Sequence, residues 1–453
     1  MKFPALPALL LLLSAAPLAA QSFFPIPETT DPARLAPYVA RTAGRLQAPP
    51  SPTDTVRVVV YGQSISMQDW WKDVKSYLEA QYPRTPLVVL NRAIGGFSAE
   101  RLKLMVANDL VPLAPDLVLF HDYGNEADYE TIIRTIRERT TAEVAVQTDH
   151  VAVGQNEAWH DRHNGEWLPA LCQKYNLALL DVRTAWKAYL QQNNLPASAL
   201  LTDGVHLNAH GNYLMAGIVK RYLAALPQAA RAAPSPIPVV YRAGNAYPAT
   251  QRKLRLPVEG NRVDLVWAPG SQAAGTTSGS VTVRIDGKKP SARPDCYFYT
   301  RPARHPEGFF LTHMGQLLAM QLAGAPQEED WTLTVTAVDT ARGQLRFTLR
   351  GSRTGEDGVG RSDSLFTSRS GRIVITPEGW FRRKSPGDFG QFRWLAPGDR
   401  LGWQVKCMGR DVVTTATPGP VTVVGGIPNG RHVLELEGQP LPAEVRVYKP
   451  QGF

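Results

Sequence analysis

Four short segments of the chain contain the residue types that acyl transfer requires. They are "GQS" at 62–64, "GG" at 95–96, "GN" at 124–125 and "DGVH" at 203–206. A serine hydroxyl is a weak nucleophile until a base removes its proton, and histidine has a suitable pKa near neutral pH. An aspartate beside the histidine fixes its tautomer, while a glycine N–H and an asparagine amide can stabilise the oxyanion. Each segment alone is more often a turn or a helix cap, so the prediction depends on their occurring together.

The elements around these segments determine whether they can meet. Near-continuous apolar runs predict strands, and helical spacing predicts helices after them. The strands are expected at 56–62, 86–93, 116–122, 142–149 and 177–182, and the helices at 69–82, 98–110, 126–140, 165–176, 184–194 and 209–226. This alternation indicates a parallel sheet covered on both faces, in which catalytic groups gather beyond the carboxyl ends of the strands. Three segments directly follow strands and the fourth precedes the last helix, so we expect all four at one rim.

The order "YGQS…NRAIGG…YGNE…DGVH" resembles the SGNH (GDSL-like) hydrolase superfamily over the length of one such domain. The resemblance implies a flavodoxin-like, three-layer α/β/α fold and ester hydrolysis through an acyl-enzyme. It implies that Ser64 is the nucleophile, His206 the base and Asp203 the residue that orients the base. It also implies an oxyanion hole made by Ser64, Gly96 and Asn125.

Two positions depart from the pattern of that superfamily. The usual Gly-Asp-Ser is Gly-Gln-Ser here, as in the branch that resembles carbohydrate O-acetylesterases, and the usual Gly-Asn-Asp ends in Glu126. Neither change removes a catalytic group, but Gln63 weakens the analogy with lipases. The Gly-x-Ser-x-Gly elbow of the α/β-hydrolases is absent. We also expect His121 and Asp122, at the end of the third strand, to hold Asn125 in place.

The loop 148–167 carries three histidines and two aspartates among its residues. Their spacing matches no recognised zinc pattern, so we predict no metal and no cofactor. We expect the loop to line the substrate cleft, where Trp159 or Trp167 could stack on a sugar. Gln63 and His150 are the further candidates for contact with substrate. A polar surface loop is the alternative.

The second half of the chain has a different texture. Residues 227–238, "PQAARAAPSPIP", indicate a linker between a hydrolase domain at 55–226 and a β-rich accessory region at 239–453. Short alternating runs divided by Gly, Pro and Asp predict antiparallel strands of one or two β-sandwiches in that region. Its aromatic residues are expected in the core, with a sugar-stacking platform at Tyr297 and Tyr299 as the alternative.

The amino-terminal residues 1–20, "MKFPALPALLLLLSAAPLAA", predict a signal peptide, since an apolar run follows Lys2 and small residues follow the run. The run is shorter than the roughly 20 residues of a membrane span. We therefore expect a secreted or periplasmic protein without stable membrane insertion, and an N-terminal extension at 21–54. Three cysteines do not form a disulfide framework, and whether Cys296 and Cys407 pair is left open.

Charge and composition narrow the class of partner. The net charge of +9 is scattered without a basic block, which favours a solvated surface over nucleic-acid binding. We expect an acylated, most simply acetylated, carbohydrate or polysaccharide as substrate. The alternatives are an esterase of lipid or aryl esters, an O-acetyltransferase, and a non-catalytic carbohydrate-binding or surface protein with a degenerate hydrolase domain. The sequence leaves the oligomeric state open.

Overall fold

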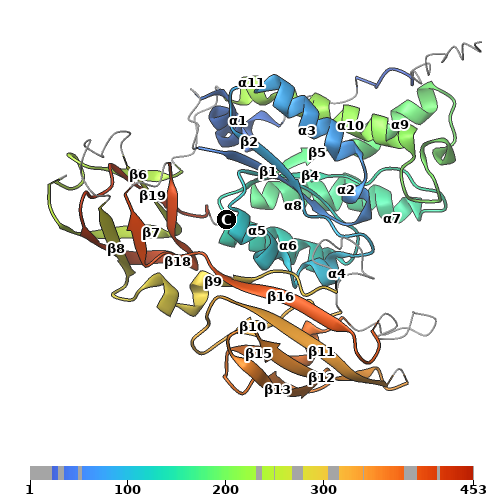
Figure 1. Ribbon diagram of the computed structural model, residues 1–453. Coiled ribbons are helices and arrows are strands. Elements are labelled where there is room, and N and C mark those ends of the chain that lie inside the picture. Colours follow the sequence, from blue (N-terminus) through green and yellow to red (C-terminus); the bar gives the residue numbers. More distant parts are fainter. Residues whose placement is uncertain are drawn as a thin grey trace, which may run out of the picture.

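The amino-terminal half is built on a five-stranded parallel sheet with the strand order β2-β1-β3-β4-β5. Its strands are β1 (Val56–Gly62), β2 (Leu87–Asn91), β3 (Leu117–His121), β4 (Glu143–Gln147) and β5 (Ala178–Leu180). This computed structural model describes residues 23–28, 35–48, 54–230, 237–248, 250–267, 279–304, 316–339, 341–381, 395–415 and 419–451. Helices cover both faces of the sheet (Figure 1). The predicted three-layer α/β/α fold with flavodoxin-like strand order is confirmed.

The strand β1 shows why these segments read as continuous apolar runs. Its side chains alternate between the two faces of the sheet, so Val58 and Val60 lie in one hydrophobic cluster and Val59 and Tyr61 in the other. All four are buried. A strand that is covered on both sides cannot alternate apolar with polar residues, and the run of valines follows from that burial.

The helices divide between the two clusters. One layer contains α1 (Ala40–Gln47), α3 (Trp70–Gln81), α9 (Val182–Gln192), α10 (Ala209–Leu223) and α11 (Leu226–Ala229). The other contains α4 (Ala99–Leu102), α5 (Val106–Leu110), α6 (Glu126–Arg139) and α8 (Leu168–Tyr175). The prediction of a single helix over 98–110 is wrong. The N–H groups of Leu104 and Met105 donate to the carbonyls three residues earlier, which forms a tight turn between α4 and α5.

The carboxyl-terminal half consists of antiparallel sheets, as predicted. A six-stranded sheet has the order β17-β8-β18-β7-β19-β6, and a five-stranded sheet has the order β13-β12-β11-β16-β9. A three-stranded sheet, β10-β15-β14, shares its hydrophobic core with the five-stranded one. The strands are β6 (Val239–Arg242), β7 (Lys253–Val266), β8 (Ser280–Ile285), β9 (Tyr297–Tyr299), β10 (Gln321–Leu322), β11 (Glu329–Asp339), β12 (Gln344–Gly351), β13 (Gly355–Arg361), β14 (Phe366–Thr367), β15 (Ile373–Ile375), β16 (Arg400–Cys407), β17 (Val412–Thr414), β18 (Val421–Gly438) and β19 (Glu444–Tyr448).

The β-rich half packs against the layer of α4, α5 and α6 (Figure 1). Ala303 and Leu318 extend the hydrophobic cluster of that layer, and Arg139 at the end of α6 donates to the carbonyl of Gly426 in β18. Tyr299 is buried in the core of the five-stranded sheet, as expected for these aromatic residues, which removes it from the alternative of a sugar platform. The cysteines Cys296 and Cys407 are free, so they do not pair.

The amino-terminal extension is described in part. Phe23 stacks on His210 of α10 with a centroid separation of 4.3 Å, and the side chain of Ile26 lies against Gly217 of the same helix. The predicted signal peptide at 1–20 lies outside the described residues. In the described part of the chain, no helix has both the length and the apolar composition needed to cross a membrane.

Candidate active site

The turn after β1 presents Ser64 at the carboxyl edge of the sheet. Gly62 ends the strand with φ at 140°, and a Cβ there would lie 1.8 Å from the carbonyl oxygen of His121. Only glycine fits this close approach of two backbones. The short helix α2 (Ser64–Met67) then begins, and the side chain of Gln63 accepts the N–H of Ile65 as its cap. Close packing of β1 and β3 therefore fixes where the serine emerges.

Ser64, His206 and Asp203 form a continuous hydrogen-bonded chain. The Nε2 atom of His206 lies 3.0 Å from the Oγ of Ser64, and its Nδ1 lies 2.8 Å from the Oδ2 of Asp203. The Oδ1 of Asp203 accepts the backbone N–H groups of Val205 and His206 at 2.8 and 2.7 Å. These backbone bonds and the bond to the ring hold the pKa of Asp203 well below its usual range. An ionised Asp203 keeps the proton on Nδ1, which leaves Nε2 free to accept one from Ser64.

The loop that carries this pair is anchored at its far end. The N–H of Leu207 donates to the Oε1 of Gln68 at 2.7 Å, and Asn208 caps α10 by accepting the N–H of Gly211 at 3.0 Å. Gln68 is not among the residues predicted for the site. Its place directly after α2, which begins at the candidate nucleophile, is the only local signal, because the partner lies 139 positions away.

The two other predicted oxyanion donors lie in adjacent loops. Asn125 caps α6, since its Oδ1 accepts the N–H groups of Ala127 and Asp128, and this turns its amide NH₂ away from the helix. Gly96 has φ at 80° and is exposed. Glu100 connects the two loops: its Oε1 accepts the N–H of Asn125 at 3.0 Å and its Oε2 accepts the hydroxyl of Ser98. Glu100 is a further residue outside the predicted set.

Gln63 and His121 occupy different places from those predicted. Gln63 is only 3% exposed, so it lies behind Ser64 and does not face the substrate. Its Nε2 lies 3.3 Å from the Nδ1 of His121, whose Nε2 lies 3.1 Å from the Oδ1 of Asp149. His121 thus contacts Gln63 and Asp149 instead of holding Asn125, because its side chain points from the end of β3 toward β1 and β4. Asp122, also predicted to hold Asn125, is buried and accepts the N–H of Tyr123.

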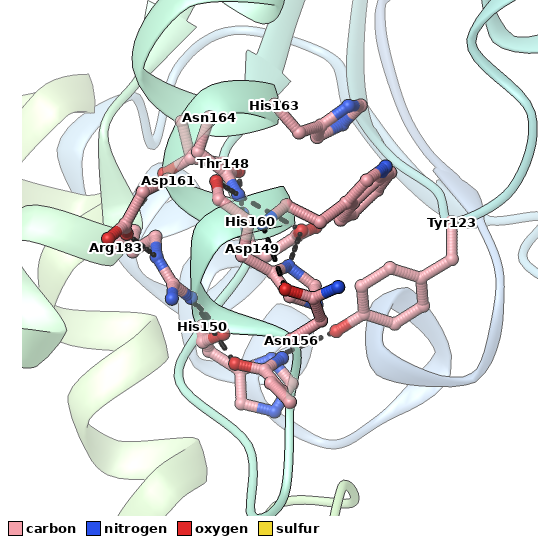
Figure 2. Close-up of polar contacts among 12 residues, drawn as sticks. Tyr123, Thr148, Asp149, His150, Asn156, His160, Asp161, His163, Asn164 and Arg183 are labelled. Carbon is pink, nitrogen blue, oxygen red and sulfur yellow. Dashed lines mark hydrogen bonds and ion pairs between the residues drawn. The ribbon is translucent and has the colours of Figure 1, made fainter.

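His150 also lies in the interior. It is fully buried, and its Nε2 donates to the carbonyl of Val205 at 2.8 Å, directly beneath the loop of His206. Figure 2 shows His150 below Tyr123, whose hydroxyl lies 3.4 Å from its Nδ1. Burial lowers the pKa of His150 to about 4. The predicted contact with substrate is therefore wrong for His150, which supports the loop of His206 from below.

Trp159 and Trp167 enclose His163 in an aromatic stack. The centroid of His163 lies 4.6 Å from Trp159 and 5.0 Å from Trp167, with nearly parallel ring planes. Both tryptophans are half-buried, and the Nδ1 of His163 lies 3.1 Å from the Oε1 of Glu126, the neighbour of Asn125 in the chain. The stack is formed by α7 (Glu157–Arg162) and a π-helical turn (His163–Trp167). A role of these tryptophans in binding substrate stays a prediction.

The polar groups of this loop serve the protein's own packing. Asp149 contacts His160 and Asn164, and the buried Arg183 contacts Asp161 (Figure 2). Arg183 also pairs with Glu157. Among the residues that the structure describes, no group of three or more His, Cys, Asp or Glu side chains is arranged to hold a metal ion.

Comparison with known proteins finds similarity only to solved structures; no family model and no curated protein matches the chain. The acetylxylan esterase Axe2 from Geobacillus stearothermophilus is 19% identical, with 37% of this chain and 94% of that chain covered and a TM-score of 0.33. A GDSL-like lipase from Parabacteroides merdae is 16% identical, with 37% and 95% covered and a TM-score of 0.34. A two-domain esterase active on acetylated mannans is 12% identical, with 93% and 96% covered and a TM-score of 0.36. At these identities and TM-scores the likeness concerns the fold alone.

Proposed function

We propose that the protein is a serine esterase that removes acyl groups, in the first place acetyl groups, from a carbohydrate. One observation carries the proposal: the chain of hydrogen bonds from Ser64 through His206 to Asp203, with separations of 3.0 and 2.8 Å. This is the arrangement that turns a serine hydroxyl into a nucleophile near neutral pH. It lies at the carboxyl edge of a parallel sheet, where such sheets place their catalytic groups.

The reaction follows from these positions. As the Oγ of Ser64 attacks the ester carbonyl carbon, its proton passes to the Nε2 of His206, and Asp203 stabilises the imidazolium that forms. The N–H groups of Ser64 and Gly96 and the amide of Asn125 are the proposed donors to the oxyanion. His206 then gives the proton to the leaving sugar hydroxyl, and the acyl group stays on Ser64. A water molecule, deprotonated by His206, releases the carboxylic acid by the same steps.

The openness of the site supports a large substrate and favours hydrolysis. The side chains of His206 and Asp203 are 41% and 59% exposed, and Asn125 is exposed as well. An ester on a polysaccharide needs such an open edge, and water can reach the acyl-enzyme there, which disfavours an acyltransferase. The stack of Trp159 on His163 next to the Asn125 loop offers an apolar ring face for a sugar. Intact catalytic positions disfavour the non-catalytic carbohydrate-binding alternative.

Export and an accessory role of the β-rich region are further parts of the proposal. Export by the leader at 1–20 would place the enzyme where polysaccharides occur. The β-rich accessory region would then lie beside the hydrolase domain along the same extended substrate.

The test is acetate release from acetylated xylan and acetylated mannan by the full chain. Replacement of Ser64 by Ala should reduce the rate by about 10⁴-fold or more, because no nucleophile remains. Ser76→Ala, an exposed serine on α3, is the matched control and should keep the rate. The lipid-ester alternative would be favoured if long-chain acids were released from p-nitrophenyl esters faster than acetate from either polysaccharide. Full activity of Ser64→Ala would refute the assignment of the nucleophile.

A further inference from the structure

The hydroxyl of Ser64 has two acceptors within reach. The Oε1 of Gln63 lies 2.6 Å from the Oγ, and the Nε2 of His206 lies 3.0 Å from the same atom. A serine hydroxyl has a single hydrogen, so it can donate fully to one of them at a time. The position of Oγ between the two acceptors therefore depends on how firmly Gln63 is held.

The amide of Gln63 has one orientation that satisfies its neighbours. Its Oε1 also accepts the N–H of Ile65 at 3.1 Å, so the oxygen must face α2 and Ser64. The NH₂ group then faces the Nδ1 of His121 at 3.3 Å. Because an amide NH₂ only donates, that Nδ1 must accept, and the ring of His121 must be neutral with its proton on Nε2.

Asp149 selects this tautomer of His121. Its Oδ1 lies 3.1 Å from the Nε2 of His121, and its Oδ2 accepts from the Nδ1 of His160 at 2.7 Å and the Nδ2 of Asn164 at 3.1 Å. Burial raises the pKa of Asp149, but the hydrogen bonds from His121 and His160 outweigh it and hold the pKa well below its usual range. An ionised carboxylate at 1% exposure accepts and cannot donate, so it requires a proton on the facing nitrogen.

We propose that Asp149 and His121 act through Gln63 to position the nucleophile, so that all three are positioning residues of the proposed esterase. Ser64 would then lie between two His–Asp pairs: the exposed His206–Asp203 pair that takes its proton, and the buried His121–Asp149 pair that orients Gln63. Gln63 holds the Oγ within reach of His206 in the resting enzyme, and the hydrogen turns from Gln63 to His206 when substrate binds. This inference rests on the proposed function, since it assigns a task within the same reaction.

The buried pair also connects the nucleophile to the loop of the aromatic stack. Asp149 lies two residues beyond the end of β4, and it contacts His160 of α7 and Asn164 of the π-helical turn (Figure 2). The same helix and turn carry Trp159 and Trp167. The backbone N–H of Asp149 donates to the Oδ1 of Asn164 at 2.7 Å, which fixes the turn to the strand end. The orientation of Gln63 and the placement of the stack thus depend on one carboxylate.

The experiment is a double-mutant cycle with Gln63→Met and Asp149→Asn in the full chain. Methionine keeps the length of Gln63 without its hydrogen bonds, and asparagine presents a donor where His121 needs an acceptor. Each change should lower kcat for an acetyl ester by about 10- to 100-fold, the cost of misplacing a reacting group, with KM nearly unchanged because neither side chain faces substrate. If both act through one chain, the double variant should be no slower than the slower single variant.

Two further readouts separate positioning from stability. The rate at which diethyl p-nitrophenyl phosphate modifies Ser64 should fall in parallel with kcat. Ring ¹⁵N spectra should show the Nε2–H form of His121 in the unaltered protein and its loss in Asp149→Asn. Asp161→Asn, whose carboxylate in the same loop pairs with Arg183 and Lys187, is the matched control and should leave both rates unchanged.

The outcomes distinguish this inference from the proposed function. The positioning role would be overturned by additive losses in the cycle, or by a Gln63→Met variant with unaltered kcat and modification rate. In either case an inactive Ser64→Ala variant would still uphold the proposed esterase. Full activity of Ser64→Ala would overturn both. If Asp149→Asn does not fold, the modification rate of Gln63→Met still decides the question.

Discussion

At the scale of single residues, three histidines near Ser64 differ in environment and therefore in role. His206 is exposed and pairs with Asp203, which suits a base that must exchange protons with substrate and water. His121 is buried and pairs with a buried carboxylate. His150 is buried against the ring of Trp186, and its two ring nitrogens contact the hydroxyl of Tyr123 and the carbonyl of Val205. The residue type is the same in each case, and burial and partner assign the task.

The pKa of His150 predicts how stability responds to acid. The folded value of about 4 lies below the value of roughly 6.5 in an unfolded chain, so between these pH values the unfolded chain binds a proton that the folded protein does not. The contribution of His150 to the free energy of unfolding should therefore be fully present above about pH 6.5. It should decrease toward pH 4, by up to about 3 kcal/mol.

Urea unfolding at about pH 7 and about pH 4.5 checks this expectation. His150→Phe should be less stable than the unaltered protein near neutrality, because the carbonyl of Val205 loses its donor. On acidification, the free energy of unfolding of His150→Phe should decrease by roughly 2 to 3 kcal/mol less than that of the unaltered protein. An equal loss in both proteins would show that His150 does not titrate in this way.

At the scale of elements, the site is assembled where strands pass into helices. Gly62 and α2 present Ser64, the start of α4 follows Gly96, and Asn125 caps α6. The N–H of Ala99 donates to the carbonyl of Tyr123 at 2.8 Å, so the last two junctions are joined by backbone as well as by Glu100. The proposed oxyanion hole is therefore a property of two adjacent junctions rather than of either alone.

Glu100→Ala tests this coupling. Without its carboxylate the Asn125 loop loses its side-chain link to α4, so kcat should fall by about tenfold, less than the roughly 10²- to 10³-fold expected when a donor is removed in Asn125→Ala. The two losses should not add, since Glu100 would act through Asn125.

Steady-state kinetics of the single and double variants measure both expectations. Glu130→Ala on α6, whose carboxylate pairs with Lys174 on the surface, is the matched control and should keep kcat. A Glu100→Ala variant with unchanged kcat would show that the backbone bond alone is sufficient.

At the scale of the whole molecule, the β-rich half is attached to the α/β half by a buried polar cluster. The carboxylate of Asp109, whose side chain is 2% exposed, accepts from the Nε and Nη2 of Arg301 at 2.6 and 2.8 Å. It also accepts from the hydroxyl of Tyr61 on β1 at 2.9 Å. Burial is the main cause that raises the pKa of Tyr61 well above its usual value. Because Tyr61 lies three positions before Ser64, the β-rich half contacts the strand that leads to the proposed nucleophile.

Arg301→Met should destabilise the protein by about 3 to 5 kcal/mol, since it leaves a buried carboxylate without its main partner. Arg304→Met, which breaks a half-exposed pair with Asp399 inside the β-rich half, should cost less than about 1 kcal/mol. Urea unfolding followed by tryptophan fluorescence compares the two.

The double variant Arg301→Met/Asp109→Leu should recover part of the loss, because no unpaired buried carboxylate remains. The recovery is incomplete because Arg92 loses its ion pair with Asp109 and the hydroxyl of Tyr61 loses its acceptor. Equal effects of Arg301→Met and Arg304→Met would instead mean that the cluster at Asp109 contributes no more than an ordinary surface pair.

The sequence by itself determined the three-layer fold, the order of its strands and helices, and the candidate residues Ser64, Asp203 and His206. These depend on local signals: apolar runs that only a doubly covered strand needs, and a short Asp-x-x-His spacing that one loop can satisfy. Only the tertiary structure decided that Gln63 and His150 face the interior. It also decided that His121 meets Gln63, which lies 58 positions away, and Asp149, which lies 28 positions away. Whether a polar side chain at a strand end faces substrate or a neighbouring strand depends on contacts between distant segments, and periodicity along one segment contains no information about them.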